Sequence, residues 1–226
     1  MKLLLTSGGV TNDSIRESLV DLLGKPIGDC TALCIPTAQY GHPMCNPMSA
    51  RRFVVGAGSS DITGLGWKSV GLLELTALPS MSRERWVPWV QEADALLVDG
   101  GEATYLCHWM RESGLAELVP SLADTVWVGV SAGSMVMTPR IGTDFMAWDP
   151  PGGSDKTLGI VDFSIFPHLD HEMMPENTLP AAEHWAAELR LPAYAIDDQT
   201  AISVSDGTVH VVSEGHWTYF PPGEGA

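Results

Sequence analysis

Short apolar runs alternate with amphipathic segments along the first two thirds of the chain. The runs are apolar at consecutive positions, which is typical of strands buried on both faces of a parallel sheet. The strands predicted in this way span Lys2–Thr6, Ala32–Pro36, Val70–Leu75, Ala95–Asp99 and Val126–Val130. This order of elements predicts an α/β fold with a mostly parallel, doubly wound sheet that helices cover on both sides.

Amphipathic helices are predicted between these strands. Asn12 or Asp13 can cap a helix that ends at about Leu23, and Gly24 follows where a glycine commonly ends a helix. Two further helices are predicted at Arg83–Glu92 and Ala103–Ser113. Each helix can therefore connect two parallel strands, as the predicted fold requires.

The C-terminal third has a different pattern. Short strands are predicted there at Tyr194–Ile196, Ala201–Val204 and Thr208–Val212. The last two are joined by Ser205-Asp206-Gly207, and Asp-Gly favours a tight hairpin. We therefore expect the sheet to gain antiparallel strands, including this hairpin, at its C-terminal end. No linker divides the sequence, so residues 1–226 are interpreted as one domain.

Two segments are predicted to be long loops. They are Ala38–Met48, which is rich in Pro, Gly, His and Met, and Trp148–Thr157. Long loops in a compact domain often line a functional site, although plain surface loops explain the pattern equally well.

The charge balance excludes some partners. The chain has 28 acidic and 12 basic residues, a formal net charge of −16. Such a surface repels phosphate backbones and anionic lipid, so we expect no nucleic-acid partner and no membrane partner. The N-terminal apolar run is too short for a signal peptide, and the four cysteines lack CxxC spacing. These features predict a cytoplasmic location and reduced thiols, and a homodimer is a further possibility.

The chemical signal comes from Gly129-Val130-Ser131-Ala132-Gly133-Ser134, which follows an apolar strand and opens a predicted helix at Ala132–Thr138. A G-x-S-x-G segment between strand and helix is the setting of a nucleophile elbow. The flanking glycines let strand and helix approach, and the N–H of Ala132 can stabilise an oxyanion. We therefore interpret Ser131 as a nucleophile; the alternative is a serine that only caps the helix.

A serine nucleophile needs a base and an acid. His168 directly follows the apolar run Ile160–Pro167. A residue at the end of such a strand lies at the carboxyl edge of a parallel sheet, so we expect His168 to be the base. Asp197 and Asp198 follow a predicted strand, and one of them can orient the imidazole. The pattern of residues does not choose between the two.

The elbow resembles the Gly-x-Ser-Ala-Gly elbow of peptidase E and its relatives, which include cyanophycinases. Three more segments are similar to motifs of this family: Asp99–Thr104, Phe166–His168 and Ile196–Gln199. The resemblance spans nearly the whole chain. It implies a class I glutamine amidotransferase-like fold, a flavodoxin-like arrangement of three layers, with serine in place of cysteine.

The resemblance also implies roles for individual residues. It makes His168 the catalytic histidine, favours Asp198 as the acid, and makes the Gly101 backbone the second oxyanion donor beside Ala132. It implies a dipeptidase-type serine peptidase that cleaves a small peptide or other acyl substrate through an acyl-enzyme, without a metal or organic cofactor. Substrate contacts are expected from residues near these motifs, namely Gly100, Glu102, Thr104, Asp170 and His171.

Two departures from the family pattern concern the substrate. Glu102-Ala103 stands where Asn-Thr is usual, and the segment after His168, LDHEMMPENTLP, has no arginine to hold an acidic residue. The choice among Asp-X dipeptides, β-aspartyl or cyanophycin-like peptides and esters therefore stays open.

Two alternatives belong to other functional classes. His168, Asp170 and His171 are residue types that bind metals, and with His184 they could build a metal-assisted hydrolase. The altered Glu102 segment would also suit an amidotransferase-like protein that binds a ligand without turnover.

Overall fold

A seven-stranded sheet forms the centre of the molecule. The computed structural model describes residues 1–57 and 62–223. The strands follow the order β3-β2-β4-β5-β1-β8-β9. Five are parallel: β1 (Lys2–Thr6), β2 (Thr31–Ile35), β3 (Ser69–Leu72), β4 (Ala95–Val98) and β5 (Val126–Val130). The other two, β8 (Thr200–Ser205) and β9 (Thr208–Ser213), pair antiparallel beside β1, which confirms the expected C-terminal hairpin.

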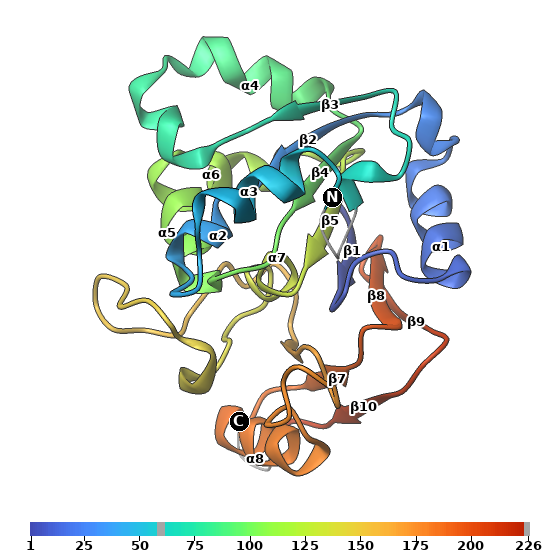
Figure 1. Cartoon of the computed structure of the whole chain (residues 1–226), viewed down its shortest axis with the longest axis vertical. Coiled ribbons are helices and arrows are strands. Elements are labelled where there is room, and N and C mark those ends of the chain that lie inside the picture. Colours follow the sequence, from blue (N-terminus) through green and yellow to red (C-terminus); the bar gives the residue numbers. More distant parts are fainter. Residues whose placement is uncertain (58–61, 224–226) are drawn as a thin grey trace.

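Helices cover both faces of this sheet (Figure 1). On one face lies α1 (Asp13–Leu23), whose Ile15 and Leu19 pack in one core cluster with Val128 of β5. Asn12 caps α1 by accepting the N–H of Ile15, and Gly24 ends it at φ 70°, so the predicted boundaries are confirmed.

The opposite face of the sheet carries most of the remaining helices. Trp86, Leu106 and Trp127 belong to the core cluster there. The helices whose residues pack on this side are α4 (Arg83–Glu92), α5 (Ala103–Glu112), α6 (Leu115–Leu118) and α7 (Ala132–Met135). Short 3₁₀ helices lie at Ile27–Asp29, Ile62–Gly64, Leu75–Ser80, Val119–Ser121 and Thr143–Phe145. The molecule is therefore built in three layers.

A second, three-stranded sheet corrects one expectation. It has the order β10-β7-β6 and consists of β6 (Ser164–Phe166), β7 (Ala193–Ile196) and β10 (Trp217–Phe220). The predicted strand Tyr194–Ile196 belongs to this sheet as β7 rather than to the main one, and β10 was not predicted. β6 pairs parallel to β7, and β10 pairs antiparallel to it.

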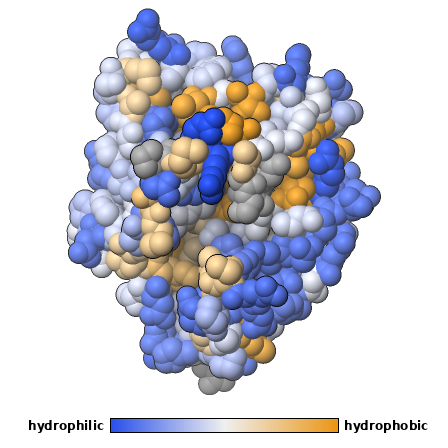
Figure 2. Space-filling view, in the orientation of Figure 1, coloured by the Kyte–Doolittle hydropathy of each residue, from blue (hydrophilic) through white to orange (hydrophobic). Residues whose placement is uncertain are grey.

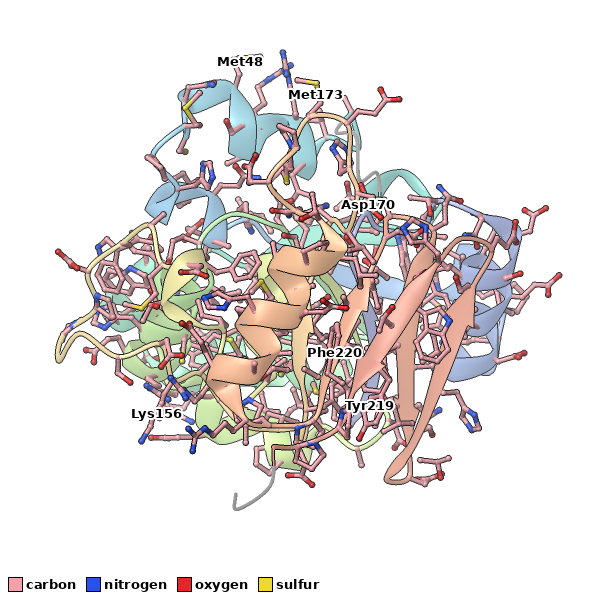
Figure 3. The ribbon with its side chains drawn as sticks, turned by 90° about the horizontal axis from the view of Figure 1, so that it is seen from below. Met48, Lys156, Asp170, Met173, Tyr219 and Phe220 are labelled. Atoms are coloured by element: carbon pink, nitrogen blue, oxygen red, sulfur yellow. The ribbon has the colours of Figure 1, made fainter. Side chains whose placement is uncertain are left out.

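Aromatic packing against α8 (Leu179–Leu189) explains why the small sheet forms. Phe166 of β6 meets Trp185 of α8 with ring centroids 5.5 Å apart, and Phe145 meets Phe166 at 5.2 Å. Phe220 of β10 packs against the same cluster, and Figure 3 shows it beside α8. The small sheet thus has a core cluster of its own.

Several element boundaries differ from the predictions. The strand expected at Val70–Leu75 ends at Leu72, and only Ser164–Phe166 of the run Ile160–Pro167 pairs as a strand. The loop predicted at Ala38–Met48 contains α2 (Ala38–Gly41) and the start of α3 (Pro47–Val54). A capping box at Asn46, followed by Pro47 in the first helical turn, explains the start of α3.

The loop predicted at Trp148–Thr157 is confirmed as irregular, and it is anchored at one end. Arg140 Nε lies 3.0 Å from the buried carboxylate of Asp155, and Arg140 forms an isolated bridge with Lys156. The end of this loop is therefore tied to the residues that directly follow the elbow.

Apolar residues on the face seen in Figure 2 gather mostly in its upper half, where β3 and α4 lie in Figure 1. Val70 and Leu72 of β3, an edge strand, are 36% and 47% exposed. In the described part of the chain, no helix combines the length and the apolarity that a bilayer crossing requires.

Candidate active site

Ser131 lies in a sharp turn between β5 and α7. Its backbone has φ 50° and ψ −110°, an uncommon conformation for a residue with a side chain. The N–H of Ser131 donates to the carbonyl of Thr6 at 3.0 Å, which ties the turn to the end of β1. A strained serine between a buried strand and a helix is the geometry of a nucleophile elbow.

Glycines make this turn possible. A Cβ atom at Gly129 would lie 2.4 Å from the carbonyl oxygen of Gly133, and one at Gly133 would lie 2.4 Å from that of Val98. Helix α7 ends at Met135 rather than at the expected Thr138. Pro139 has no N–H to donate to the Met135 carbonyl, and the N–H groups of Leu158 and Ile160 donate to the carbonyls of Val136 and Met137. The elbow is thus a short helical turn wedged against β4.

Two backbone N–H groups beside Ser131 are free to donate. The N–H of Gly100 donates to the Asp99 carboxylate at 2.8 Å, and the N–H of Glu102 donates to the carbonyl of Ala38 at 2.9 Å. Within residues 1–57 and 62–223, the N–H groups of Gly101 and Ala132 donate to no other group. As far as the described residues show, these two donors are therefore available for a ligand.

Gly101 should not tolerate a side chain, whereas Gly100 should. Gly101 has φ +136°, and an added Cβ would lie 2.4 Å from the Ala38 backbone. Gly101→Ala is therefore expected to lower the free energy of unfolding by about 2–5 kcal/mol, measured by urea denaturation. The control is Gly100→Ala, whose Cβ would make contacts of 3.4 Å or longer. Equal stability of the two variants would contradict the expectation.

His168 reaches the serine from the loop after β6. Its Nε2 atom lies 2.9 Å from Ser131 Oγ, and its Nδ1 atom lies 2.8 Å from Asp198 Oδ1. The strand that precedes it, β6, pairs parallel to β7, so His168 follows the carboxyl end of a strand as expected, although this strand belongs to the small sheet. Its backbone adopts φ 57°, which turns the chain sharply at this residue.

The two neighbouring aspartates have different surroundings. Asp198 faces His168 and also accepts a hydrogen bond from the Ser7 hydroxyl at 2.6 Å. Burial raises the pKa of the Asp198 carboxyl, but the hydrogen bonds from His168 and Ser7 outweigh burial and hold the pKa below its usual value. The carboxylate is therefore ionised at neutral pH.

Asp197, which directly follows β7, is buried, and its side chain points away from the side on which Asp198 faces His168. It accepts hydrogen bonds from the Thr200 hydroxyl at 2.6 Å and from the backbone N–H of His216 at 2.8 Å. The His216 ring also places Nδ1 3.0 Å from Asp197 and Nε2 3.0 Å from Asp170. Asp197 thus connects the start of β8 with the segment before β10, and it does not contact His168.

The residues after His168 surround Asp198 from the other side. His171 accepts the N–H of Met173 at Nδ1, at 3.0 Å, and its Nε2 atom faces Asp198 Oδ2 at 3.5 Å. Both ring nitrogens of His171 are therefore engaged. Asp170 is half exposed and lies at the base of the loop that carries Met173 (Figure 3). The expected substrate contacts of Asp170 and His171 stay predictions.

Glu102 and Thr104 lie at the start of α5 and are 1% and 2% exposed. The Glu102 carboxylate caps the helix by accepting the N–H of Tyr105 and the hydroxyl of Thr104, and it also accepts the N–H of Ala147 at 3.3 Å. These side chains serve the fold at this turn, so a substrate contact through them would require these bonds to open. The contacts expected for Gly100, which abuts Ser131, need no such change.

The described residues contain no group of three or more His, Cys, Asp or Glu side chains arranged to hold a metal ion. His184, the further ligand of the metal alternative, is exposed on α8 and pairs with Glu188 at 3.3 Å. Among the described residues, the metal-assisted alternative therefore has no ligand set.

Asp99, buried beside the Gly100–Gly101 turn, should make stability depend on pH. Burial raises the pKa of Asp99 to about 7, against hydrogen bonds from Gln39 and Gly100 that lower it. The unfolded carboxyl has a pKa of about 3.9. At pH values between this pKa and that of the folded protein, only the folded state keeps the Asp99 carboxyl protonated. Stability should therefore fall as pH rises from about 4 to about 7, by on the order of 4 kcal/mol.

The matched variant is Asp99→Asn, which keeps an acceptor for Gly100 and has no proton to lose. Urea unfolding at pH 5 and pH 8 should show a fall for the natural protein and a much smaller one for the variant. The low pKa of Asp198 acts only at more acidic pH, so it does not mask this effect. Equal falls in both proteins would exclude Asp99 as the cause.

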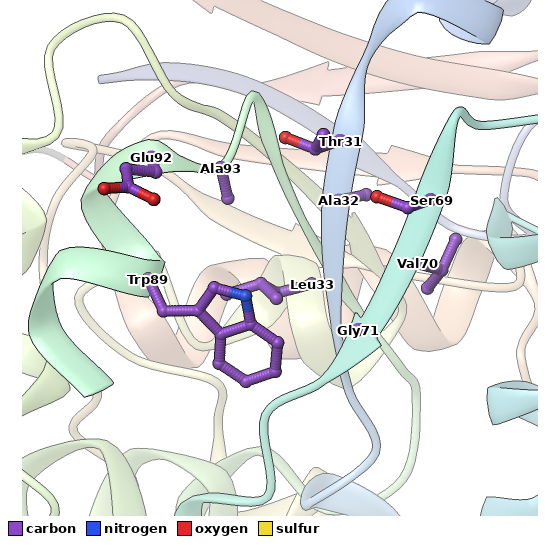
Figure 4. A pocket seen from close by; sticks show the side chains of 9 residues that line it. All are labelled: Thr31, Ala32, Leu33, Ser69, Val70, Gly71, Trp89, Glu92 and Ala93. Atoms are coloured by element: carbon purple, nitrogen blue, oxygen red, sulfur yellow. The ribbon is translucent and has the colours of Figure 1, made fainter. Parts of the chain in front are cut away.

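A hollow of about 360 Å³ lies away from these residues. Figure 4 shows it between β2, β3 and α4, near the amino ends of the two strands, with Trp89 beside Leu33 and Gly71. Its lining consists of Thr31, Ala32, Leu33, Ser69, Val70, Gly71, Trp89, Glu92 and Ala93. Ser131 and His168 stand at the carboxyl ends of strands, where ligands of open α/β sheets bind, so this hollow is separate from the candidate site.

Sequence comparison gives a family and two relatives. The model of peptidase family S51 matches residues 3–212. Peptidase E from Nostoc sp. (strain PCC 7120) is 26% identical over 144 residues, which are 60% of this chain and 59% of the relative. Peptidase E from Streptomyces coelicolor is 37% identical over 83 residues, 35% of this chain and 33% of the relative. The matched segments thus span less than two thirds of either relative.

Solved structures are similar over nearly the full chain. A protein from Listeria monocytogenes EGD-e described as peptidase E has a TM-score of 0.69 at 21% identity, with coverage of 95% of this chain and 98% of that one. A peptidase from an acI-B1 actinobacterium has a TM-score of 0.65 at 21% identity, with coverage of 99% and 95%. This likeness confirms the predicted α/β fold.

Proposed function

The chain belongs to peptidase family S51, and on this premise we propose that it is a serine hydrolase that cleaves a small peptide or a related acyl substrate. The proposed nucleophile is Ser131, the general base is His168, and Asp198 orients the base. One observation carries the proposal: the line of hydrogen bonds from Ser131 Oγ through the His168 ring to Asp198, at 2.9 and 2.8 Å. These distances suit proton transfer between the groups.

The proposed reaction proceeds in two halves. His168 Nε2 takes the Ser131 proton while the hydroxyl oxygen attacks the substrate carbonyl, and the N–H groups of Gly101 and Ala132 stabilise the oxyanion. His168 then gives that proton to the leaving amine, and the acyl group stays on Ser131. A water molecule, deprotonated by His168, releases the acyl group and restores the serine.

The charges near the site bear on the substrate. Asp170, Glu172 and Glu176 lie in the segment that follows His168, and this segment has no arginine. A substrate with an acidic residue on the acyl side would find no cationic partner there. We therefore propose a dipeptidase-type activity that is not restricted to Asp-X substrates. A cytoplasmic location and a homodimer stay predictions.

The alternative of ligand binding without turnover loses its main support at Glu102. The unusual glutamate is a buried helix cap rather than a replacement group in the site, and Ser131, His168 and Asp198 lie within hydrogen-bond distance of one another. The altered motif is thus compatible with a working hydrolase.

A fluorophosphonate probe tests the proposal, because it reacts with serines that a neighbouring base activates. We expect one adduct, mapped by mass spectrometry to Ser131, and no adduct in His168→Ala. A panel of dipeptides with acidic, neutral and basic first residues then defines the substrate class. An unlabelled Ser131 together with no hydrolysis across the panel would exclude the proposed function.

A further inference from the structure

Ser7 lies where three segments of the proposed site meet. It follows β1, which lies between β5 and β8 in the main sheet. β5 leads to Ser131, and β8 begins two residues after Asp198. The Ser7 side chain is fully buried. Ser7 therefore lies at the proposed site, at the carboxyl end of β1, although it is far in sequence from Ser131, His168 and Asp198.

The Ser7 hydroxyl joins the histidine to the acid. Ser7 Oγ accepts a hydrogen bond from the backbone N–H of His168 at 2.7 Å and donates a hydrogen bond to Asp198 Oδ1 at 2.6 Å. It also lies 3.2 Å from His168 Nδ1. A hydroxyl has one proton and two lone pairs, so one atom can serve all three contacts. The backbone of His168 and the carboxylate of Asp198 are thus fixed to a common point.

His168 needs such a fixed point because its backbone is strained. A φ of 57° is unfavourable for a residue with a side chain and persists only where the surroundings hold it. The bond from its N–H to Ser7 is one such restraint. Loss of this bond would let the backbone relax and move the imidazole away from Ser131.

Gly8, which follows Ser7, lies in close contact with Asp198. A Cβ at Gly8 would lie 2.8 Å from both Cβ and Cγ of Asp198, so the close approach requires glycine. Thr11 adds a hydrogen bond to the carbonyl of Asp198 at 2.6 Å. The loop between β1 and α1 therefore holds Asp198 by packing, by its backbone and by its side chain.

We propose that Ser7 is a positioning residue for the reaction, which aligns His168 and Asp198 so that Nε2 meets Ser131. The inference rests on the proposed function. The hydrogen bonds of the Ser7 hydroxyl go to His168 and Asp198, so it acts through the histidine and the acid. The hydrogen bond from the Ser7 hydroxyl also favours the ionised form of Asp198, because it lowers the pKa of the carboxyl.

The variant Ser7→Ala tests the inference. The second-order rate constant for labelling of Ser131 by the fluorophosphonate probe should fall roughly 10- to 100-fold, as expected for a lost hydrogen bond to a charged group. The proton NMR resonance of the hydrogen bond between His168 and Asp198 should shift or broaden. The matched control is Ser164→Ala, which removes another fully buried hydroxyl with one bond, to the carbonyl of Arg140. This control should change neither reading.

The outcomes separate the inference from the function. A natural protein that neither labels at Ser131 nor hydrolyses any dipeptide of the panel would exclude the proposed function itself. Labelling of the natural protein together with equal labelling of Ser7→Ala overturns only the role of Ser7. Should Ser7→Ala fail to fold, Ser7→Cys decides: the weaker hydrogen bonds of a thiol should slow labelling, and an unchanged rate would overturn the inference.

Discussion

Replacing Ser131 by alanine is expected to lower turnover by about 10⁵- to 10⁶-fold, because the proposed reaction needs the hydroxyl as its nucleophile. The fold should survive. The Ser131 hydroxyl makes a hydrogen bond to His168 Nε2, and alanine occupies the strained backbone about as readily as serine. We therefore expect the free energy of unfolding to change by less than about 1.5 kcal/mol.

The measurement is the hydrolysis of a 4-nitrophenyl ester and of the best dipeptide from the panel. Ser134→Ala is the matched control in the same elbow, since Ser134 is fully buried and its hydroxyl donates to the carbonyl of Thr6 at 2.7 Å. It should lose stability and keep most of its turnover. Turnover within tenfold of the natural protein in Ser131→Ala would reject the proposed nucleophile.

Asp198→Asn is expected to lower turnover by about 10⁴-fold while the protein stays folded. An asparagine amide in place of the carboxylate can turn its NH₂ toward His168 Nδ1. The imidazole would then carry its proton on Nε2, which faces Ser131, and could no longer accept the serine proton. The loss should appear in kcat, because Asp198 orients the base rather than binding substrate.

Asp197→Asn should have the opposite effects on stability and turnover. Asp197 is 7% exposed and accepts hydrogen bonds from Gln199, Thr200 and His216, so its loss leaves buried donors unpaired. A destabilisation of about 2–4 kcal/mol is expected, with turnover largely kept in the folded protein. Urea denaturation and kcat, measured on both variants, distinguish the two aspartates. A reversed result would make Asp197 the acid.

The predicted main strands, the hairpin and the elbow agree with the structure because each rests on local signals. Buried strands such as Val126–Val130 are apolar throughout, and Asp206-Gly207 strongly favours a tight turn, in which both residues have positive φ. The small sheet left no such signal. β6 pairs only three residues, and β10 reads Trp-Thr-Tyr-Phe, a short edge strand that is separated from its partner β7 by the hairpin of β8 and β9. Only tertiary packing against α8 selects these segments.

Candidate site residues were found where a motif or a strand end marks them, as at Ser131 and His168. The choice between Asp197 and Asp198 depends on which way each side chain leaves the strand end, and neighbouring residues of the same type give no periodic signal for that. Ser7 directly follows the predicted strand Lys2–Thr6, and no motif marks it. Its contacts with His168 and Asp198 join opposite ends of the chain, and no local pattern encodes a contact of that kind.

The place of β1 in the sheet has a consequence for synthesis. The ribosome makes β1 first and β8, its second neighbour in the sheet, among the last strands. Until β8 has emerged, β1 has only β5 beside it, and Asp198 is not yet there to face His168. Domains assemble only as their segments leave the ribosome. A nascent chain therefore carries the proposed nucleophile Ser131 before Asp198, the proposed acid that orients its base, has been made.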